Sequence, residues 1–305
     1  MKVAIICNNP VALPSVKLLA DMGGLCSVAT VSSNAEMCAV LSSFPIDPGI
    51  SVKIFEPSGF EQQLNNWLSD VQPDGVLMMT WPFRIPVSAL GKPKYGFINF
   101  HYGLLPAYAG ANPVFEQIKR REQFGGITIH HADAGIDTGP VIMQQRIPIS
   151  DGETFGSHMR NLSYVGAELS GRLFGTMAGG QPLPAFAQDR NAIKYYRKPS
   201  QQDVRVNWSS MDAEGITALA NACNPWNYGA TTEINNWPLG LLTVNINNSE
   251  HGRLPGTILS INGEGLEIAC INNKSVMIPV VYTQDGYIKG ERLKHYGLKE
   301  GMCFS

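Results

Sequence analysis

The sequence of 305 residues lacks several features that mark common protein classes. It has no Cys-x-x-Cys pair, and its six scattered cysteines are typical of reduced thiols rather than a disulfide framework. No apolar run approaches the length of a membrane span, and the five-residue run near the N-terminus is too short for a signal-peptide core. We therefore expect a soluble, cytoplasmic protein with no membrane partner.

Positive charge and cofactor motifs are also scarce. The formal net charge is -2, which is unlike the basic surface that binds nucleic acid. No Gly-x-Gly-x-x-Gly follows the first strand-like segment, so a dinucleotide site is not expected. No histidine or cysteine pair with zinc-type spacing is joined by a second cluster, so we expect no metal.

What the sequence does contain is a regular alternation of apolar segments. With 44% hydrophobic residues, the chain can form one large or two medium domains. The pattern predicts strands at Val3–Cys7, Leu25–Val31, Asp74–Thr80, Tyr95–His101, Gly126–His131 and Pro140–Ile149, and helices at 12–22, 60–68, 114–121 and 154–177. Strands alternating with helices predict an α/β fold with an open, mostly parallel, Rossmann-like sheet.

The composition changes after this region. Prolines, polar residues and a Tyr-Tyr pair between residues 181 and 200 indicate a linker. One helical stretch, Met211–Ala222, is followed by short apolar segments separated by Asn, Gly and Pro turns, which is typical of a small antiparallel barrel. We predict an N-terminal α/β domain at 1–186, a linker at 187–204 and an OB-like C-terminal β-barrel at 205–305.

Two polar residues, Asn99 and His101, end the strand that precedes a Gly/Pro-rich loop. Residues two apart on a strand project from the same face, so the pair can converge on one ligand atom. Ligands of open α/β sheets bind outside the carboxyl ends of strands. This position therefore predicts a site, although Asn99 could instead close a turn and His101 could be a satisfied loop residue.

A third candidate is Asp137, in a Gly-flanked loop between two predicted strands. An aspartate can accept a hydrogen bond from one imidazole nitrogen, which fixes the tautomer and raises the basicity of the other nitrogen. An amide that donates to an oxyanion, a base and its orienting carboxylate suit acyl transfer.

The sequence motifs in these segments resemble those of the folate-dependent formyltransferase family. The chain carries an Asn-x-His strand end at Asn99-Phe100-His101, a Leu-Leu-Pro loop at 104–106 with Gly110, and an Asp-x-Gly-x-Asp-Thr-Gly loop at 133–139. The segments Tyr195-Tyr196-Arg197-Lys198 and Asn224-Pro225-Trp226 resemble the interdomain segment and the start of the C-terminal domain in two-domain members. The resemblance therefore covers nearly the whole chain.

The resemblance implies that the co-substrate is N10-formyltetrahydrofolate. Asn99 would bind the formyl oxygen, His101 would take a proton from the attacking amine, and Asp137 would hold His101. The loop after the third predicted strand, residues 80–86, would surround the pterin, and main-chain groups around Phe83, Arg84 and Ile85 would bind its hydrogen-bonding edge. The Asp133–Asp137 loop would close the other side. The implied folate-binding residues are Trp81, Phe83, Arg84, Ile85, Asp133 and Gly135. For Trp81 and Phe83 the alternative is plain loop packing.

The acceptor is expected to be a small-molecule or carrier-bound amine, such as a nucleotide-linked amino sugar or an amino-acid derivative. Residues 31–50 contain no Lys or Arg, whereas tRNA-formylating relatives carry a basic loop there. Residues 205–305 carry seven Lys and Arg against nine Asp and Glu, so little phosphate neutralisation is offered and tRNA is not expected. The barrel is expected to help bind the acceptor or to form a homodimer surface.

The same residues are compatible with three other functions. Water in place of the amine would make the protein a formyltetrahydrofolate hydrolase. A non-catalytic relative would only bind folate or RNA, against which the intact Asn99, His101 and Asp137 argue. Full methionyl-tRNA formylation is the remaining alternative.

Overall fold

The computed structural model describes residues 1–45, 47–247 and 250–305. These residues divide into two compact units, each described here by itself. The first unit comprises Met1–Gly110, Gly125–Ile147 and Met159–Tyr196, and the second comprises Ala111–Phe124, Pro148–His158 and Arg197–Ser305. The predicted domain boundaries at residues 186 and 204 stay predictions.

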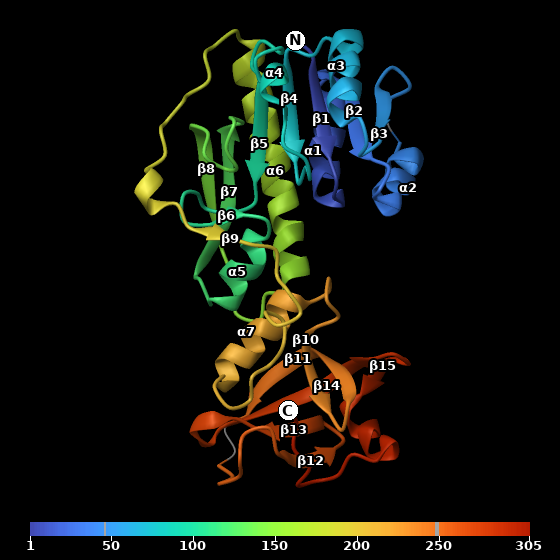
Figure 1. Cartoon of the computed structure of the whole chain (residues 1–305), viewed down its shortest axis with the longest axis vertical. Coiled ribbons are helices and arrows are strands. Elements are labelled where there is room, and N and C mark those ends of the chain that lie inside the picture. The colour runs from blue at the N-terminus through green and yellow to red at the C-terminus, as the bar shows by residue number, and fades with distance from the viewer. Residues whose placement is uncertain (46, 248–249) are drawn as a thin grey trace. The chain divides into compact units, whose positions relative to one another are not determined.

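A seven-stranded sheet with the order β3-β2-β1-β4-β5-β7-β8 forms the centre of the first unit (Figure 1). Its strands are β1 (Val3–Cys7), β2 (Leu25–Val31), β3 (Ser51–Phe55), β4 (Gly75–Met79), β5 (Phe97–His101), β7 (Phe124–His131) and β8 (Val141–Pro148). The pairs from β3 to β5 are parallel, and β7 pairs with β5 in the antiparallel direction. The predicted mostly parallel α/β sheet is confirmed.

Helical segments connect the parallel strands, because parallel neighbours need a crossover connection. The helical segments up to residue 200 are η1 (Pro10–Ala12), α1 (Leu13–Asp21), α2 (Ala35–Ser43), α3 (Phe60–Val71), α4 (Val87–Leu90), α5 (Pro113–Lys119), α6 (Phe155–Ala178) and η2 (Arg190–Ala192). Two short strands, β6 (Ala109–Gly110) and β9 (Tyr195–Tyr196), pair in a separate parallel ladder.

The core of the first unit follows from strand alternation. Every residue of β1 and β4 is buried, which explains why both strands are continuous apolar runs. Ala4, Ile6, Val76 and Met78 belong to a cluster with residues of α3, among them Leu64. Alternate side chains of these strands point to the opposite face.

The second unit contains a six-stranded antiparallel sheet with the order β10-β11-β14-β13-β12, and β15 pairs with β14. Its elements are α7 (Ala213–Cys223), β10 (Ala230–Ile234), β11 (Trp237–Asn247), β12 (Ile258–Asn262), β13 (Gly265–Ala269), η3 (Ile271–Asn273), β14 (Ser275–Thr283), β15 (Gly286–Lys289) and η4 (Gly290–Tyr296). The predicted strand-rich antiparallel C-terminal part is confirmed, and its closure into an OB-like barrel stays a prediction. None of the described helices is long and apolar enough to cross a membrane.

Candidate active site

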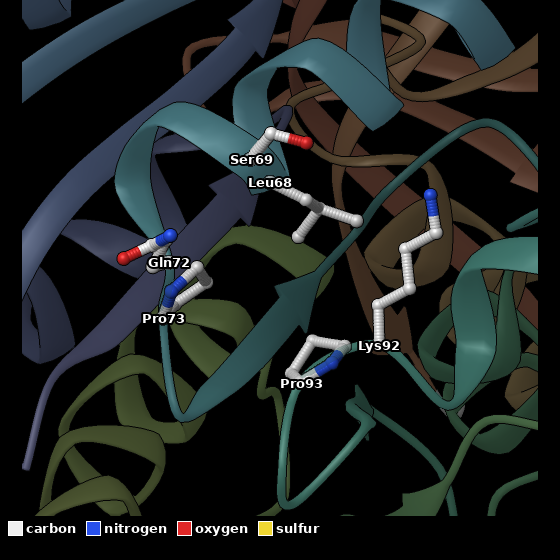
Figure 2. Close-up of a pocket in the computed structure, with 6 residues that line it drawn as sticks. All are labelled: Leu68, Ser69, Gln72, Pro73, Lys92 and Pro93. Atoms are coloured by element: carbon white, nitrogen blue, oxygen red, sulfur yellow. The ribbon is translucent and has the colours of Figure 1, made fainter.

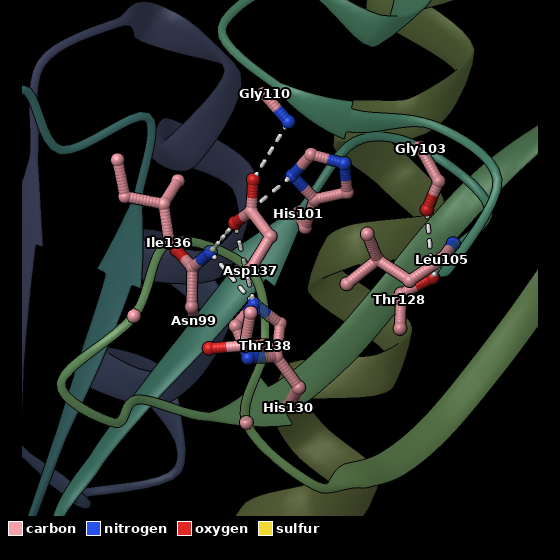
Figure 3. Close-up of polar contacts among 12 residues, drawn as sticks. Asn99, His101, Gly103, Leu105, Gly110, Thr128, His130, Ile136, Asp137 and Thr138 are labelled. Atoms are coloured by element: carbon pink, nitrogen blue, oxygen red, sulfur yellow. Dashed lines mark hydrogen bonds and ion pairs between the residues drawn. The ribbon is translucent and has the colours of Figure 1, made fainter. Parts of the chain in front are cut away.

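The three predicted catalytic side chains converge at the carboxyl end of β5. Three nitrogen atoms surround Oδ1 of Asp137: Asn99 Nδ2 at 3.3 Å, His101 Nδ1 at 3.5 Å and His130 Nε2 at 3.6 Å (Figure 3). The other carboxylate oxygen, Oδ2, accepts a hydrogen bond from the main-chain N–H of Gly110 at 2.9 Å. We call Asn99, His101, His130 and Asp137 the Asp137 cluster.

The strand pairing explains how these side chains meet. Asn99 and His101 project from the same face of β5, and antiparallel pairing with β7 sets Asn99 opposite His130. Asp137 reaches them from the loop between β7 and β8, where its φ of +56° lies in the left-handed region. Asp tolerates this region better than most residues because its short polar side chain can bond locally.

Hydrogen bonding fixes the tautomer of His130 and the orientation of the Asn99 amide. His130 Nδ1 lies 2.9 Å from the carbonyl oxygen of His131, an acceptor, so Nδ1 carries the proton. His130 Nε2 then accepts from Asn99 Nδ2 at 3.0 Å. The second N–H of Asn99 points to Asp137 and makes the longer bond, so it is the donor that can most readily turn to a ligand.

His101 is nearly enclosed, with only 6% of its surface exposed. Its Nε2 lies 2.5 Å from the carbonyl oxygen of Tyr108, to which it donates. In the neutral ring the lone pair is therefore on Nδ1, which faces Asp137. A proton that arrives at Nδ1 produces an imidazolium between two acceptors, so the site stabilises the product of a proton transfer.

The pKa values of the two groups are shifted in the directions that a base and its counter-ion need. Burial lowers the pKa of His101, and Asp137 and the Tyr108 carbonyl oppose that shift without cancelling it. Burial by itself would raise the pKa of Asp137, but the neighbouring His101 and the hydrogen bond from Gly110 N–H oppose that shift, and the pKa lies below its usual value. Neutral His101 and ionised Asp137 therefore coexist near neutral pH.

The predicted pterin loop follows β4 and has two kinds of residue. Trp81 and Phe83 pack edge-on, with ring centroids 5.8 Å apart, and both contact the aromatic core around Phe60. The Ile85 side chain is also in the core, whereas Arg84 is exposed. In the described part of the chain, no main-chain group of residues 81–85 has a hydrogen-bond partner, and neither does the buried Nε1 of Trp81.

The Asp133–Asp137 loop is held by its own contacts. Asp133 Oδ1 accepts from the main-chain N–H of Gly135 at 3.0 Å and from the hydroxyl of Thr138 at 2.8 Å. A Cβ atom at Gly135 would overlap with the Thr138 side chain, so this turn requires glycine. These contacts account for both residues structurally, and their predicted contact with folate stays a prediction.

Sequence reasoning missed three groups of this site. His130 lies within the predicted strand Gly126–His131 without being singled out, because its place in the site depends on the β5–β7 register, which the sequence does not display. The carbonyl of Tyr108 and the N–H of Gly110 are main-chain groups, which carry no residue-type signal. Spacing alone offers one hint, since His130 precedes Asp137 by seven residues across a tight loop.

A buried threonine joins the Leu-Leu-Pro loop to the sheet. Thr128 Oγ1 donates to the Gly103 carbonyl at 2.7 Å and accepts from Leu105 N–H at 3.0 Å (Figure 3). It also accepts from Gln144 Nε2 at 2.8 Å. Thr128 is opposite His101 in the β5–β7 register. The hydroxyl therefore fixes the loop that begins at the catalytic strand end.

Thr128→Val should destabilise the protein, because it keeps the side-chain shape but leaves the buried Leu105 N–H without its acceptor. An unsatisfied buried polar group costs about 1–3 kcal/mol. We expect that decrease in the free energy of unfolding in urea, followed by circular dichroism. The control is Thr243→Val, at an exposed threonine of β11, where the loss should stay within about 0.5 kcal/mol. Equal effects of the two substitutions would contradict the assignment.

One surface pocket of the first unit lies at the opposite end of the sheet. It has a volume of about 390 Å³ and is lined by Leu68, Ser69, Gln72, Pro73, Lys92 and Pro93, from the segments that precede β4 and β5 (Figure 2). Lys92 Nζ donates to Asn65 Oδ1 at 2.7 Å. The six lining residues include no carboxylate, imidazole or thiol, so this pocket lacks the acid–base groups that the Asp137 cluster contains. No group of three metal-ligating side chains occurs among the described residues.

Comparisons with known families cover both parts of the chain. Residues 1–169 match the family described as "Formyl transferase", and residues 198–288 match "Formyl transferase, C-terminal domain". A methionyl-tRNA formyltransferase of Stenotrophomonas maltophilia (strain K279a) is 28% identical over 225 residues, which are 72% of this chain and 71% of that protein.

Solved structures with the same fold include two that are informative. HypX from Aquifex aeolicus in complex with tetrahydrofolic acid gives a TM-score of 0.69 at 16% identity; 98% of this chain is covered, and the chain spans about half (48%) of HypX. An N-formyltransferase from Helicobacter canadensis, in complex with folinic acid and dTDP-3-aminofucose, gives a TM-score of 0.64 at 17% identity and covers 91% of this chain and 98% of that one.

Proposed function

Because the chain belongs to the formyl transferase family, we propose that it moves a formyl group from N10-formyltetrahydrofolate to the amine of a small-molecule or carrier-bound acceptor. The observation that carries this proposal is the convergence of Asn99, His101 and Asp137 at the carboxyl end of β5. An amide donor, a neutral buried imidazole and an ionised carboxylate in one cluster match the needs of acyl transfer between two nitrogens.

The proposed reaction exchanges one carbon–nitrogen bond for another. The acceptor amine attacks the formyl carbon, a new N–C bond forms, and the bond from that carbon to N10 of the folate breaks. Asn99 donates its second N–H to the oxyanion of the tetrahedral intermediate. His101 takes the proton from the attacking amine and passes it to the leaving N10, so no external oxidant, reductant or metal is consumed.

Asp137 supports the proton transfer in two ways. Its carboxylate faces Nδ1 of His101, where the proton arrives, and it stabilises the imidazolium that forms. Its other oxygen accepts a hydrogen bond from Gly110 N–H, which orients the carboxylate. The Tyr108 carbonyl keeps the other ring nitrogen protonated, so the tautomer is correct before the amine arrives.

The residues present also fit a folate. The unpartnered main-chain groups of residues 83–85 and the buried Nε1 of Trp81 are donors and acceptors that a pterin ring could satisfy. We propose that Trp81, Phe83, Arg84 and Ile85 hold the pterin on one side and that Asp133 and Gly135 close the other side. The ring packing of Trp81 and Phe83 makes the loop rigid, which pre-organises this edge.

The activity should fall when His101 becomes protonated. Burial lowers the pKa of His101 from its ordinary value of 6.5, so the base stays neutral through pH 6.5 and charges only in more acidic solution. The acid limb of kcat/KM should therefore lie below pH 6.5. Asp137→Asn removes a charge that raises the pKa of His101, so its acid limb should move to lower pH still. A limb above pH 6.5, or a shift of the opposite sign, would contradict this assignment.

A second candidate acceptor is methionyl-tRNA, which the 28% identical relative favours. Against it, α2 and its flanks carry no Lys or Arg, and acidic residues outnumber basic ones in residues 205–305. Affinity for nucleic acid depends mainly on phosphate neutralisation, so these surfaces favour a small acceptor. Hydrolysis of the co-substrate remains the competing outcome when water takes the place of the amine.

The test presents the purified protein with N10-formyltetrahydrofolate and three acceptor classes: nucleotide amino sugars, ornithine-type amines and charged initiator tRNA. Formylated product is identified by mass spectrometry, and formate is measured in parallel. We expect transfer to one of the first two classes. Formylation of the tRNA alone would select the second candidate, and formate release that no amine suppresses would identify a hydrolase.

A further inference from the structure

Residues 186–196 run along both loops of the site, and we call them the strap. The strap begins on β8, where Phe186 and Val141 exchange two main-chain hydrogen bonds of 2.8 and 2.9 Å. It ends as β9, which pairs in parallel with β6, the short strand that follows the Leu-Leu-Pro loop. All of these residues belong to the first unit, so both ends of the strap are anchored within it.

Gln188 of the strap holds the turn that carries the catalytic carboxylate. Its Nε2 donates to the carbonyls of Asp137 at 2.9 Å and Gly139 at 2.7 Å. These two carbonyls flank Thr138, so the amide bridges the turn in which Asp137 adopts its positive φ. The Gln188 Oε1 atom is buried and has no partner among the described residues. Burying an unpaired acceptor costs free energy, which the two donated bonds must offset.

The other end of the strap holds the surroundings of His101. The Tyr195 hydroxyl donates to the carbonyl of Ile136, the residue before Asp137. The Tyr196 ring stacks on Tyr108, with centroids 5.4 Å apart and planes at 16°. Tyr108 supplies the carbonyl that binds His101 Nε2. The strap therefore contacts the residues that orient both the base and its counter-ion.

Gly110 shows how closely the strap approaches the site. This residue has a φ of +107°, and a Cβ atom there would overlap with the main chain of Tyr196. Its N–H, aimed by this conformation, is the donor to Asp137 Oδ2. The strap and the Asp137 cluster therefore share one closely packed main-chain position.

We propose that the strap is a positioning element of the formyl-transfer site and that Gln188 is a positioning residue that acts through Asp137. This inference rests on the proposed function. Without the two donated bonds the turn at 137–139 can relax, and the carboxylate then leaves Nδ1 of His101. The chemistry would slow although Gln188 touches no reacting atom.

Gln188→Met tests the proposal because it keeps the side-chain length and removes the donors. We expect kcat to fall about 10- to 100-fold, a part of the range for a misaligned base. In an Asp137→Asn background the same substitution should cost less than about threefold, because residues that act through one group are not additive. Gln181→Met, at an exposed glutamine just after α6, is the matched control and should leave kcat unchanged.

A second readout does not depend on turnover. The charged and titratable groups facing His101 are Asp137 and His130, and Asp137 raises its pKa. In Gln188→Met the titration of the His101 ring, followed by NMR with labelled histidine, should move to lower pH. Tyr195→Phe, which removes only the hydroxyl bond to Ile136, should move it in the same direction by a smaller amount. This milder variant preserves the test if Gln188→Met does not fold.

An unchanged kcat together with an unchanged His101 titration in folded Gln188→Met would overturn the strap proposal. A full loss that persists in the Asp137→Asn background would overturn it as well, since Gln188 would then act elsewhere. A wild-type protein that neither transfers nor hydrolyses the formyl group would overturn the proposed function instead. In that case the NMR titration still decides whether the strap positions Asp137.

Discussion

His101→Gln is expected to lower kcat for formyl transfer by about 10²–10⁴-fold, the contribution of a positioned general base. Glutamine retains a donor for the Tyr108 carbonyl, so the loop contact can survive while the titratable nitrogen is lost. The acid limb of kcat/KM that we assign to His101 should disappear in the residual activity. Single-turnover measurements with saturating acceptor separate this loss of chemistry from slow product release.

Two comparisons make this result specific. His295→Gln changes an exposed histidine of the second unit and should leave kcat within about twofold, as surface substitutions usually do. Binding of 5-formyltetrahydrofolate to His101→Gln should stay close to that of the wild type, because in the proposed mechanism His101 acts on the reacting nitrogens and not on the pterin. If the variant keeps more than a tenth of the wild-type kcat, the base must be another residue.

Asn99→Ala is expected to lower kcat by about 10²–10³-fold, the typical effect of losing one oxyanion donor. The loss should appear in kcat and in kcat/KM alike, because the bond to the oxyanion exists only in the transition state. His130 loses its cross-strand donor in the same variant, so its ring orientation can also change. Comparison with His130→Ala separates that effect from the missing oxyanion donor.

The control for Asn99 is Asn66→Ala on the exposed face of α3, where alanine suits the helix. This variant should have wild-type kinetics. A loss in Asn99→Ala that is confined to KM, with kcat intact, would mean that Asn99 contributes ground-state binding and not oxyanion stabilisation. In that case the donor would have to be sought among the main-chain groups of the site.

Much of the fold could be predicted because the buried strands carry a strong signal. Val3–Cys7 and Leu25–Val31 were predicted with their observed bounds, since a parallel strand covered on both faces is a continuous apolar run. The long helix α6 was predicted within one residue at each end. Periodicity alone sufficed for these elements.

Two elements were missed for the opposite reason. β3 (Ser51–Phe55) is an edge strand in which only Phe55 is buried, and its polar–apolar alternation, Ser-Val-Lys-Ile, covers only four residues. α2 (Ala35–Ser43) buries only Met37 and Leu41 and begins with an Asn34 cap that the sequence analysis did not use. Weak burial leaves little pattern to detect.

The candidate site divides in the same way. Asn99 and His101 could be predicted as a pair because residues two apart on one strand share a face. Asp137 could be predicted because its loop is recognisable by its glycines. His130 is brought to the site by the antiparallel pairing of β7 with β5. Gln188 contacts the site from a segment 51 residues beyond Asp137 in the sequence. Contacts between segments that are distant in the sequence leave no local sequence pattern, so only the three-dimensional structure reveals them.

The short ladder between Ala109–Gly110 and Tyr195–Tyr196 has a consequence for dissecting the protein. A fragment that ends at residue 186 would keep all the proposed catalytic side chains. It would lose residues 187–196 of the strap, which contact the residues that orient them. The smallest piece worth expressing for study of the chemistry therefore runs through Tyr196.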